Sequence, residues 1–351
     1  MTFALRRSLP GLPLALFAIA PLTAQTPPPA ASLGGVVYTQ FLYQLRDTAN
    51  HVNNFDVTRA YVNLIGRFSD GVATRVTADI YRQPVGGDGS LRYRLKYAYV
   101  AYTPQHSPLT FKFGQFQTPL LDWEEALWDY RMQGTMALER GDQIAPRSYL
   151  SSADFGAGVD GKWGPDKVTM QVGIFNGENY NGGTGDQRKD LMGRVSVRLR
   201  DTDDSSRVGG LRVTGYAQIG KPTSGGTRNR FLGMVSYRST QLTLAAQFAS
   251  TEDTVSAGPV ASATGRVISG FGVFRVPNSK VAVIGRIDVV DPNTRAANNR
   301  QTRIIAGASY QLSPNLRLLA DLDHLSYEGG APTPALEAVR SQALFQAQFT
   351  F

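Results

Sequence analysis

From Leu33 onward the side chains alternate between polar and apolar with a period of two residues, which is the period of a β-strand. The clearest run is Leu91 to Thr103, whose polar face is basic: Arg92, Arg94 and Lys96. The opposite face of this run is apolar or aromatic: Leu91, Tyr93, Leu95, Tyr97 and Tyr99. The same alternation recurs around Val197, Val213 and Leu244. Segments of about ten residues with this pattern are typical of outer-membrane β-barrels.

The alternation predicts an all-β chain with about sixteen strands. They are expected at residues 33–46, 55–68, 72–82, 91–103, 109–117, 154–163, 167–176, 190–200, 208–220, 229–238, 241–250, 263–276, 280–289, 301–310, 315–325 and 339–351. A soluble β-sandwich alternates too, but here the apolar face stays clean in segment after segment and the opposite face is rich in arginine. The pattern therefore favours a transmembrane antiparallel β-barrel, which in bacterial single-chain proteins has an even number of strands.

The connections between these segments alternate in length. Tight turns are expected at Ser69-Asp70 and Gly164 to Asp166, and long loops at 176–189 and 326–338. Short periplasmic turns and long external loops are the usual asymmetry of such barrels. With both termini in the periplasm, residues 118–152 become the third external loop. At about 35 residues this loop is far longer than an ordinary connection, and we predict that it folds into the bore as a constriction loop.

The constriction loop has a helix-like apolar stripe, formed by Leu121, Trp123, Ala126, Leu127, Tyr130 and Met132. Asp122 is a candidate helix cap, with Glu125 three residues later in a capping-box-like arrangement. The charged residues assigned to the constriction loop are Glu124, Asp129, Arg131 and Arg140, of which the first three are expected at the aperture. They are expected to face Arg75, Arg94 and Lys112 on the wall. The alternative is that the loop acids pair with the wall and hold the loop in place.

Strand parity turns most basic residues away from lipid, because an Arg or Lys facing the bilayer midplane costs about 2–4 kcal/mol. The residues assigned to the pore lining and to anion binding are Arg59, Arg75, Arg92, Arg94, Lys96, Lys112, Arg194, Arg198 and Arg212. The main acids on the same face are Asp79, Asp288, Asp321 and Asp323. Rings of Arg and Lys select anions. The alternative is that these bases pair with acids on neighbouring strands and only rigidify the wall.

The chain ends in the alternating strand QALFQAQFTF. Its phenylalanines, Phe345, Phe349 and Phe351, share one face, and the other face is polar. Pairing of this strand with the first would close the barrel and remove both sheet edges. A final Phe on such a strand also resembles the signal read by the bacterial barrel assembly machinery, so that machinery is an expected partner.

The N-terminus has the features of an export signal. Arg6 and Arg7 form the positive region, Leu9 to Leu22 is apolar, and Leu22-Thr23-Ala24 offers a cleavage site. A membrane anchor is disfavoured because the apolar run is shorter than the ~20 residues that a spanning helix needs. We therefore expect a signal peptide at 1–24, a proline-rich lead-in at 25–32 and a barrel at 33–351.

One stretch of the chain resembles a known family. Phe111 to Pro119, FKFGQFQTP, is similar to the K-x-G-Q-F-K-T-P segment of the phosphate-selective porin O and P family. Glu139-Arg140, Asp154 to Gly156 and Phe175 to Gly177 resemble further motifs of that family. The resemblance implies a homotrimer of sixteen-stranded barrels with the third loop folded inward. The loop departs from a phosphate trap because Asp122, Glu124, Glu125 and Asp129 make its first half acidic.

Other classes of function fit less well. The chain has no Cys, and its three His lack metal-ligand spacing, so no cofactor or metal is expected. Catalysis is disfavoured because alternation turns His324 away from Asp321 and Asp323. The formal net charge of +8 is spread along strands rather than gathered in one patch, which argues against a nucleic-acid partner.

The sequence therefore predicts an outer-membrane porin, in contact with outer-membrane lipid, for passive diffusion of small, mostly anionic solutes, with phosphate and other oxyanions among the candidates. The alternatives are a general porin of low selectivity, a barrel blocked by its own loop and, least favoured, a barrel hydrolase.

Overall fold

The computed structural model describes residues 30–82, 88–139, 149–182, 186–222, 226–254 and 263–351. The expected signal peptide at 1–24 lies outside these ranges, and so does Arg140 of the expected constriction. Of the expected lead-in at 25–32, the last three residues are described, and they already belong to the first strand.

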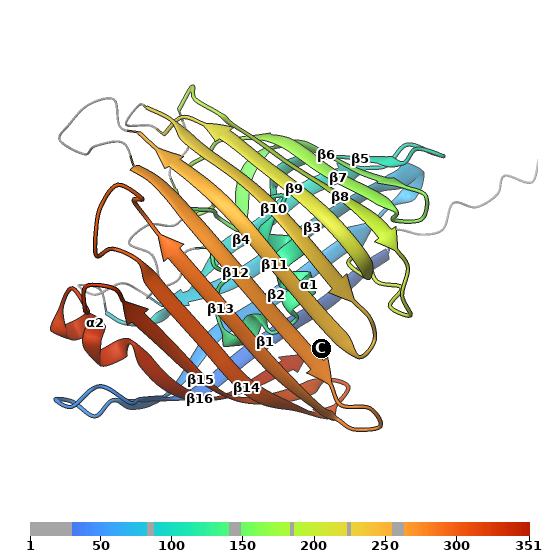
Figure 1. Cartoon of the computed structure of the whole chain (residues 1–351). Coiled ribbons are helices and arrows are strands. Elements are labelled where there is room, and N and C mark those ends of the chain that lie inside the picture. Colours follow the sequence, from blue (N-terminus) through green and yellow to red (C-terminus); the bar gives the residue numbers. More distant parts are fainter. Residues whose placement is uncertain (1–29, 83–87, 140–148, 183–185, 223–225, 255–262) are drawn as a thin grey trace, which may run out of the picture.

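Within these ranges sixteen antiparallel strands form a closed barrel, in which sequence neighbours pair and the first strand pairs with the last (Figure 1). The strands are β1 (Ala30–Gln44), β2 (Asn53–Arg67), β3 (Val72–Arg82), β4 (Leu91–Tyr102), β5 (Leu109–Gln117), β6 (Ala153–Trp163), β7 (Val168–Phe175), β8 (Asp190–Arg200), β9 (Gly210–Gly220), β10 (Arg228–Arg238), β11 (Leu242–Asp253), β12 (Ala263–Arg275), β13 (Val281–Asp291), β14 (Gln301–Ser313), β15 (Leu316–Tyr327) and β16 (Ser341–Thr350). Each predicted segment coincides with one of them, so the sixteen-stranded all-β barrel is confirmed.

In the described ranges, two short α-helices lie in the connections of the barrel. They are α1 (Leu121–Trp128), between β5 and β6, and α2 (Pro334–Val339), between β15 and β16. Over the described ranges, no helix has the length and apolar character needed to cross a membrane.

The barrel closes along β1 and β16. Their register runs from Val36 opposite Thr350 to Gln44 opposite Gln342. Phe351 extends the seam, because its carbonyl accepts from the Gly35 amide at 2.9 Å and its amide donates to the Gly35 carbonyl at 3.1 Å. The prediction that the last strand pairs with the first is therefore confirmed, and no sheet edge remains along this seam.

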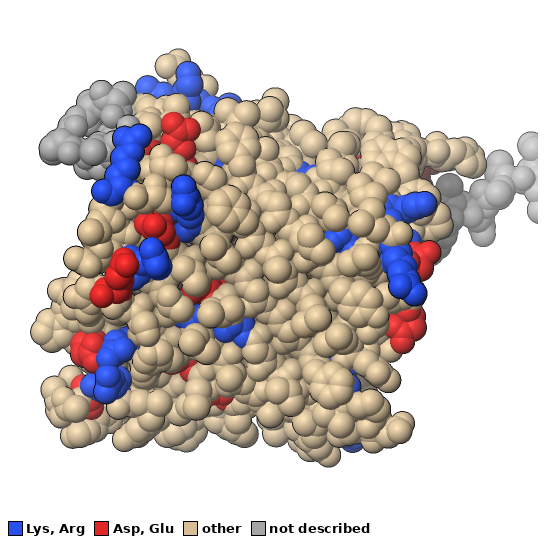
Figure 2. Space-filling view, in the orientation of Figure 1, with Lys and Arg blue, Asp and Glu red and all other residues tan. Residues whose placement is uncertain are grey.

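The two faces of the wall differ as the alternation predicts. In β11 and β12 the side chains of Phe248 and Ile268 are 50% and 53% exposed, whereas those of Gln247 and Ser269 are at most 5% exposed. Figure 2 shows that most charged side chains on the visible face lie toward the two ends of the strands, and that the middle of this face is largely uncharged. The outer face of the wall is thus an apolar belt.

Strand β4 departs from simple alternation. Thr77 of β3 lies opposite Tyr97, but the next residue, Ala78, lies opposite Leu95. Lys96 is therefore the extra residue of a β-bulge, which exchanges the two faces of the strand beyond it.

The bulge overturns part of the predicted parity. Tyr97 is only 8% exposed, and Val100 is 53% exposed. Tyr99 packs against the buried ring of Phe116, with ring centroids 6.2 Å apart. The prediction that Tyr97 and Tyr99 share the apolar outer face is wrong, because the inserted residue turns both of them inward.

Strands β2 and β3 are paired over only part of their length. Their ladder runs from Arg67 opposite Ala73 to Val62 opposite Ala78 and ends there. Beyond it, two ion pairs bridge the strands. Arg59 Nη1 lies 2.9 Å from Asp79 Oδ2, and Arg82 pairs with Asp56. Side chains therefore replace backbone hydrogen bonds at this place in the wall.

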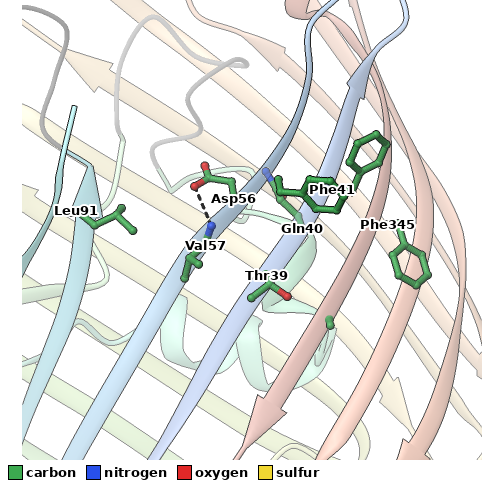
Figure 3. A pocket seen from close by; sticks show the side chains of 9 residues that line it. Thr39, Gln40, Phe41, Asp56, Val57, Leu91 and Phe345 are labelled. Carbon is green, nitrogen blue, oxygen red and sulfur yellow. Dashed lines mark hydrogen bonds between the residues drawn. The ribbon is translucent and has the colours of Figure 1, made fainter. Parts of the chain in front are cut away.

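A recess of about 490 Å³ lies where β1, β2, β4 and β16 come together (Figure 3). It is lined by Thr39, Gln40, Phe41, Phe55, Asp56, Val57, Leu91, Phe345 and Ala347. The Asp56 carboxylate accepts from the Val57 amide at 2.8 Å, which turns it back onto its own strand. The recess is mostly apolar, like the outer belt that it interrupts.

Closure at β1 generates a prediction about one glycine. A Cβ on Gly35 would lie 2.4 Å from the backbone oxygen of Tyr61, so Gly35→Ala forces a backbone shift beside the closing seam. We expect it to destabilise the barrel by roughly 1–3 kcal/mol, as overpacking does. The control is Gly233→Ala, whose Cβ would meet no atom within 4 Å. The measurement is the temperature at which the purified protein loses its folded band on an unheated gel. Equal temperatures for the two variants would contradict the seam geometry.

Candidate pore and constriction

The connection between β5 and β6 contacts the inner wall. Its described part contains α1 and a short 3₁₀ turn, Arg131–Gln133. Figure 1 shows α1 behind β11 and β12, and the helix contacts both of these strands. The 3₁₀ turn contacts β16. Residues of this connection therefore meet strands that are distant from β5 in the sequence.

An apolar contact holds this connection to the wall. Leu127 and Trp128 of α1 are fully buried, as is Leu121 at the start of the helix. The Trp128 ring lies 5.4 Å from the ring of Phe271 on β12, centroid to centroid. The same cluster includes inward side chains of five strands: Leu232, Met234, Ala245, Phe271, Ile284, Leu319 and Leu325. One side of the bore is therefore an apolar patch that the connection covers.

The start of α1 differs from the capping prediction. The helix begins at Leu121, its cap residue is Leu120, and no side chain caps it. Asp122 lies inside the first turn, where its carboxylate pairs with Arg207 at 2.7 Å. The prediction that Asp122 caps the helix is wrong, because Arg207 competes for its carboxylate. The helix ends at Trp128, and the next residue, Asp129, adopts a left-handed conformation with φ of 62°.

Polar contacts fix the same side of the connection. Gln247 Nε2 of β11 donates to Glu124 Oε1 at 2.6 Å. The carboxylate of Asp129 lies 3.5 Å from Arg275 and 3.4 Å from Arg317. Glu124 and Asp129 were expected to face the aperture, but both contact the wall. Glu124 and Asp129 therefore fit the alternative hypothesis, in which acids of the loop pair with the wall and hold the loop in place.

Three arginines surround one tryptophan of α1. The guanidinium carbon of Arg194 lies 4.0 Å from the ring centroid of Trp123, and those of Arg212 and Arg207 lie 5.4 and 5.8 Å away. Arg194 and Arg212 were assigned to the pore lining, yet they are 5% and 0% exposed. Their contacts anchor α1 by cation–π interactions.

The sequence analysis missed Arg207. It lies in the nine-residue connection 201–209 between β8 and β9, at the end of the barrel that carries the short turns. The same connection supplies Asp204, which pairs with Arg238 at 2.6 Å, and Arg238 also donates to the Ala126 carbonyl of α1. The unusual length of this turn was the available signal.

The opposite side of the bore keeps polar groups accessible. Side chains of Arg59, Arg94 and Lys112 are 19%, 20% and 14% exposed. Arg59 and Arg94 both donate to Asp79 Oδ2 at 2.9 Å, and Lys112 lies 2.5 Å from Asp160. These residues come from β2 to β6, the part of the wall that the apolar cluster leaves largely uncovered.

Arg75 and Lys96 have no carboxylate partner among the described residues. Arg75 donates to Asn63 at 2.8 Å and lies over the Tyr97 ring, 4.6 Å from its centroid. Lys96 donates to the Tyr61 hydroxyl at 3.0 Å and is only 2% exposed. Arg75 is therefore the partly exposed cation of the predicted set whose charge is not locally neutralised.

The side of the connection that faces β2 to β6 carries charge of both signs. Arg131 lies 2.7 Å from Glu125 and 3.0 Å from Glu139. Arg131 was predicted at the aperture, whereas its two acidic partners were not assigned there. We refer to the space between these loop groups and the basic wall of β2 to β5 as the passage.

Two predicted pore residues lie at the ends of the barrel instead. Arg92 is exposed and pairs with Asp88 at 3.1 Å, beside the β3–β4 connection. Arg198 lies 2.9 Å from Asp201, near the turn that follows β8. The structure therefore groups Arg59, Arg75, Arg94, Lys96 and Lys112 and separates them from Arg92, Arg194, Arg198 and Arg212.

His324, the histidine that lies beside acids in the sequence, contacts neither of them in the structure. His324 contacts two hydroxyls, Ser341 at 2.6 Å and Ser326 at 3.0 Å. Asp323, the acid next to it in sequence, pairs instead with Arg303. Over the described part of the chain no group of three His, Cys, Asp or Glu could hold a metal ion.

The barrel resembles solved outer-membrane proteins. An anion-selective porin from Comamonas acidovorans has a TM-score of 0.64 and 13% identity, covering 92% of this chain and 100% of its own. OmpT of Vibrio cholerae, an outer membrane protein in its trimer form, has a TM-score of 0.63 and 12% identity, covering 92% and 99%. The outer membrane channel DcaP of Acinetobacter baumannii has a TM-score of 0.60 and 13% identity, covering 92% and 97%.

These likenesses establish the fold. The chain has the sixteen-stranded barrel fold found in outer-membrane porins. No protein-family model and no curated protein match the sequence. The resemblance to the phosphate-selective porin O and P family stays a prediction.

The buried carboxyl of α1 generates a pH prediction. Burial raises the pKa of Glu124 to about 8, from an ordinary value of 4.5. The undocked loop therefore releases this proton at lower pH than the docked loop, so docking weakens as pH rises from about 4.5 to about 8. We expect single-channel current to fluctuate more at pH 9 than at pH 6, and Glu124→Gln to remove this difference. Glu337→Gln on the partly exposed α2 is the control. A pH response that survives in Glu124→Gln would contradict the assignment.

Proposed function

We propose that this protein is an outer-membrane porin, and that the β5–β6 connection lies in the bore and narrows it to the passage. The observation that carries the proposal is the division of the inner wall. The apolar patch of β10 to β15 is covered by α1, while β2 to β5 present partly exposed basic groups. Water and solutes then have a polar route along one side of the bore.

The balance of charge along the passage favours anions. The wall contributes five basic residues, Arg59, Arg75, Arg94, Lys96 and Lys112, and two acids, Asp79 and Asp160. The loop side and the 201–209 connection contribute two arginines, Arg131 and Arg207, and three acids, Asp122, Glu125 and Glu139. The passage therefore carries two net formal positive charges, and low-dielectric walls concentrate their field.

A general porin of low selectivity is the second candidate. It is favoured by the pairing of most passage cations with carboxylates, which leaves Arg75 as the partly exposed cation without one. A tight phosphate site needs several converging donors, and the acids Asp122 and Glu125 on the loop side would oppose it. We therefore propose a preference for anions without specific retention of phosphate or other oxyanions.

The setting of the protein follows from the same features. The apolar outer belt supports contact with outer-membrane lipid. The protein would reach this membrane by export through its N-terminal signal. The barrel assembly machinery would then recognise Phe351 and insert the barrel. The solved trimer of Vibrio cholerae OmpT supports a homotrimer. Passive diffusion through the passage requires no cofactor, no catalytic residue and no nucleic acid.

Reversal of the unpaired charge tests the proposal. Arg75→Glu changes the passage charge by two units, so we expect the chloride-over-potassium permeability ratio to fall by roughly threefold or more. The measurement is the reversal potential of purified protein in a planar bilayer under a KCl gradient. The control is Arg266→Glu, at an exposed position of β12 outside the passage. An unchanged ratio above one in Arg75→Glu would show that Arg75 does not contribute to anion selectivity. An absence of conductance in the unmodified protein would contradict the porin proposal.

A further inference from the structure

A second cavity lies next to the 3₁₀ turn of the connection, inside the barrel. Its volume is about 310 Å³. It is lined by Gln40, Leu42, Thr58, Arg59, Arg131, Met132, Gln133, Gly134, Thr135, Arg303, Asp323, Gln342 and Leu344. Arg303 is the third residue of β14, and Gln342 is the second residue of β16. Both follow long connections, so the cavity lies toward the long-loop end of the barrel, before the passage.

Three guanidinium groups line this cavity with donors to spare. Arg59 donates one N–H, to Asp79. Arg131 uses Nε and Nη2 for Glu125 and Glu139, and Arg303 uses Nε and Nη2 for Asp323. Each guanidinium carries five N–H donors in a planar fork. Within the described residues the Nη1 groups of Arg131 and Arg303 have no acceptor, so they are available to a ligand.

The rest of the lining distinguishes between kinds of anion. Leu42, Met132 and Leu344 give the cavity an apolar side, which an inorganic oxyanion cannot use. The negative charge of Asp323 disfavours a ligand with two negative charges. Both carboxylate oxygens of Asp323 already accept hydrogen bonds, from Arg303 and Gln133. A planar carboxylate matches the guanidinium fork. The amide of Gln342, which is 5% exposed, adds hydrogen-bonding capacity beside it.

We propose that this cavity is a binding subsite for small organic monocarboxylates with an apolar portion, which it collects before the passage. The carboxylate accepts from the guanidinium groups of Arg59 and Arg131, and the apolar portion lies against Leu42 and Leu344. The subsite rests on the proposed porin function and names its substrate class. A volume of about 310 Å³ is at the small end of ligand pockets, which suits solutes of about ten heavy atoms.

The test compares block of single-channel chloride current by benzoate, acetate and phosphate. We expect benzoate to block at concentrations at least tenfold below those of acetate and phosphate. Arg59→Gln should weaken block by benzoate and by acetate by about tenfold, the loss expected for one charge-assisted hydrogen bond. Leu344→Asn should weaken block by benzoate and leave acetate unchanged. These two variants separate the charged contact from the apolar contact.

Arg75→Gln is the matched charge control. It also removes one positive charge from the bore, but Arg75 does not line the cavity. It should lower anion selectivity and keep the benzoate-over-acetate ratio. The subsite is overturned if benzoate and phosphate block the unmodified channel equally, a comparison that needs no variant, or if Arg75→Gln weakens benzoate as much as Arg59→Gln. Absence of chloride current in the unmodified protein would instead refute the porin function itself.

Discussion

The packing of α1 against the apolar patch of the inner wall is the contact on which the proposed route for water through this barrel depends. The patch is formed by inward residues such as Leu232, Phe271 and Ile284, which would face a wet bore without the helix. Burying a large apolar side chain stabilises by about 1.5–3 kcal/mol, and α1 alone buries Leu121, Trp123, Leu127 and Trp128. The connection and the patch therefore depend on each other, while Arg59, Arg94 and Lys112 on the other side stay partly exposed.

The arginines of the wall divide according to this contact. Arg194 and Arg212 lie under α1, where burial of a charge is costly unless it is compensated. Trp123 and backbone carbonyls compensate them: Arg194 donates to the Pro119 carbonyl at 2.9 Å, and Arg212 donates to the Gly209 carbonyl at 2.8 Å. On the open side, Arg59 and Arg94 share Asp79 and remain partly exposed. The arginines that contact α1 are thus different from those that stay partly exposed on the open side.

The sequence was sufficient for the barrel because each strand carries its own evidence. Alternation placed all sixteen strands, and the polar and aromatic faces of the last one indicated closure. The predicted facing of the side chains was wrong at Tyr97 and Tyr99. The sequence continues to alternate around Lys96, and only the strand register reveals the bulge there. The helix of the connection was also predictable, since its apolar stripe is local.

The partners of the charged loop residues were not predictable. Glu124 and Gln247 are 123 residues apart, and Asp129 and Arg317 are 188 apart. Which side of the bore a loop acid faces depends on where the helix docks, and no local pattern contains that information. The same reason explains why Arg207 was missed and why the cavity beside Arg131, built from six separate parts of the chain, could not be foreseen.

The most direct test of this account is the accessibility of single cysteines on the two sides of the bore, because the chain has none of its own. Asn63→Cys places a thiol beside Arg75 on the open side, and Ile284→Cys places one under α1, where the native side chain is 2% exposed. With the protein in a planar bilayer, a charged water-soluble thiol reagent should react with Asn63→Cys and reduce the current, and should leave Ile284→Cys unchanged. Rapid reaction at Ile284→Cys, at the rate seen for Asn63→Cys, would contradict a bore divided by the docked loop.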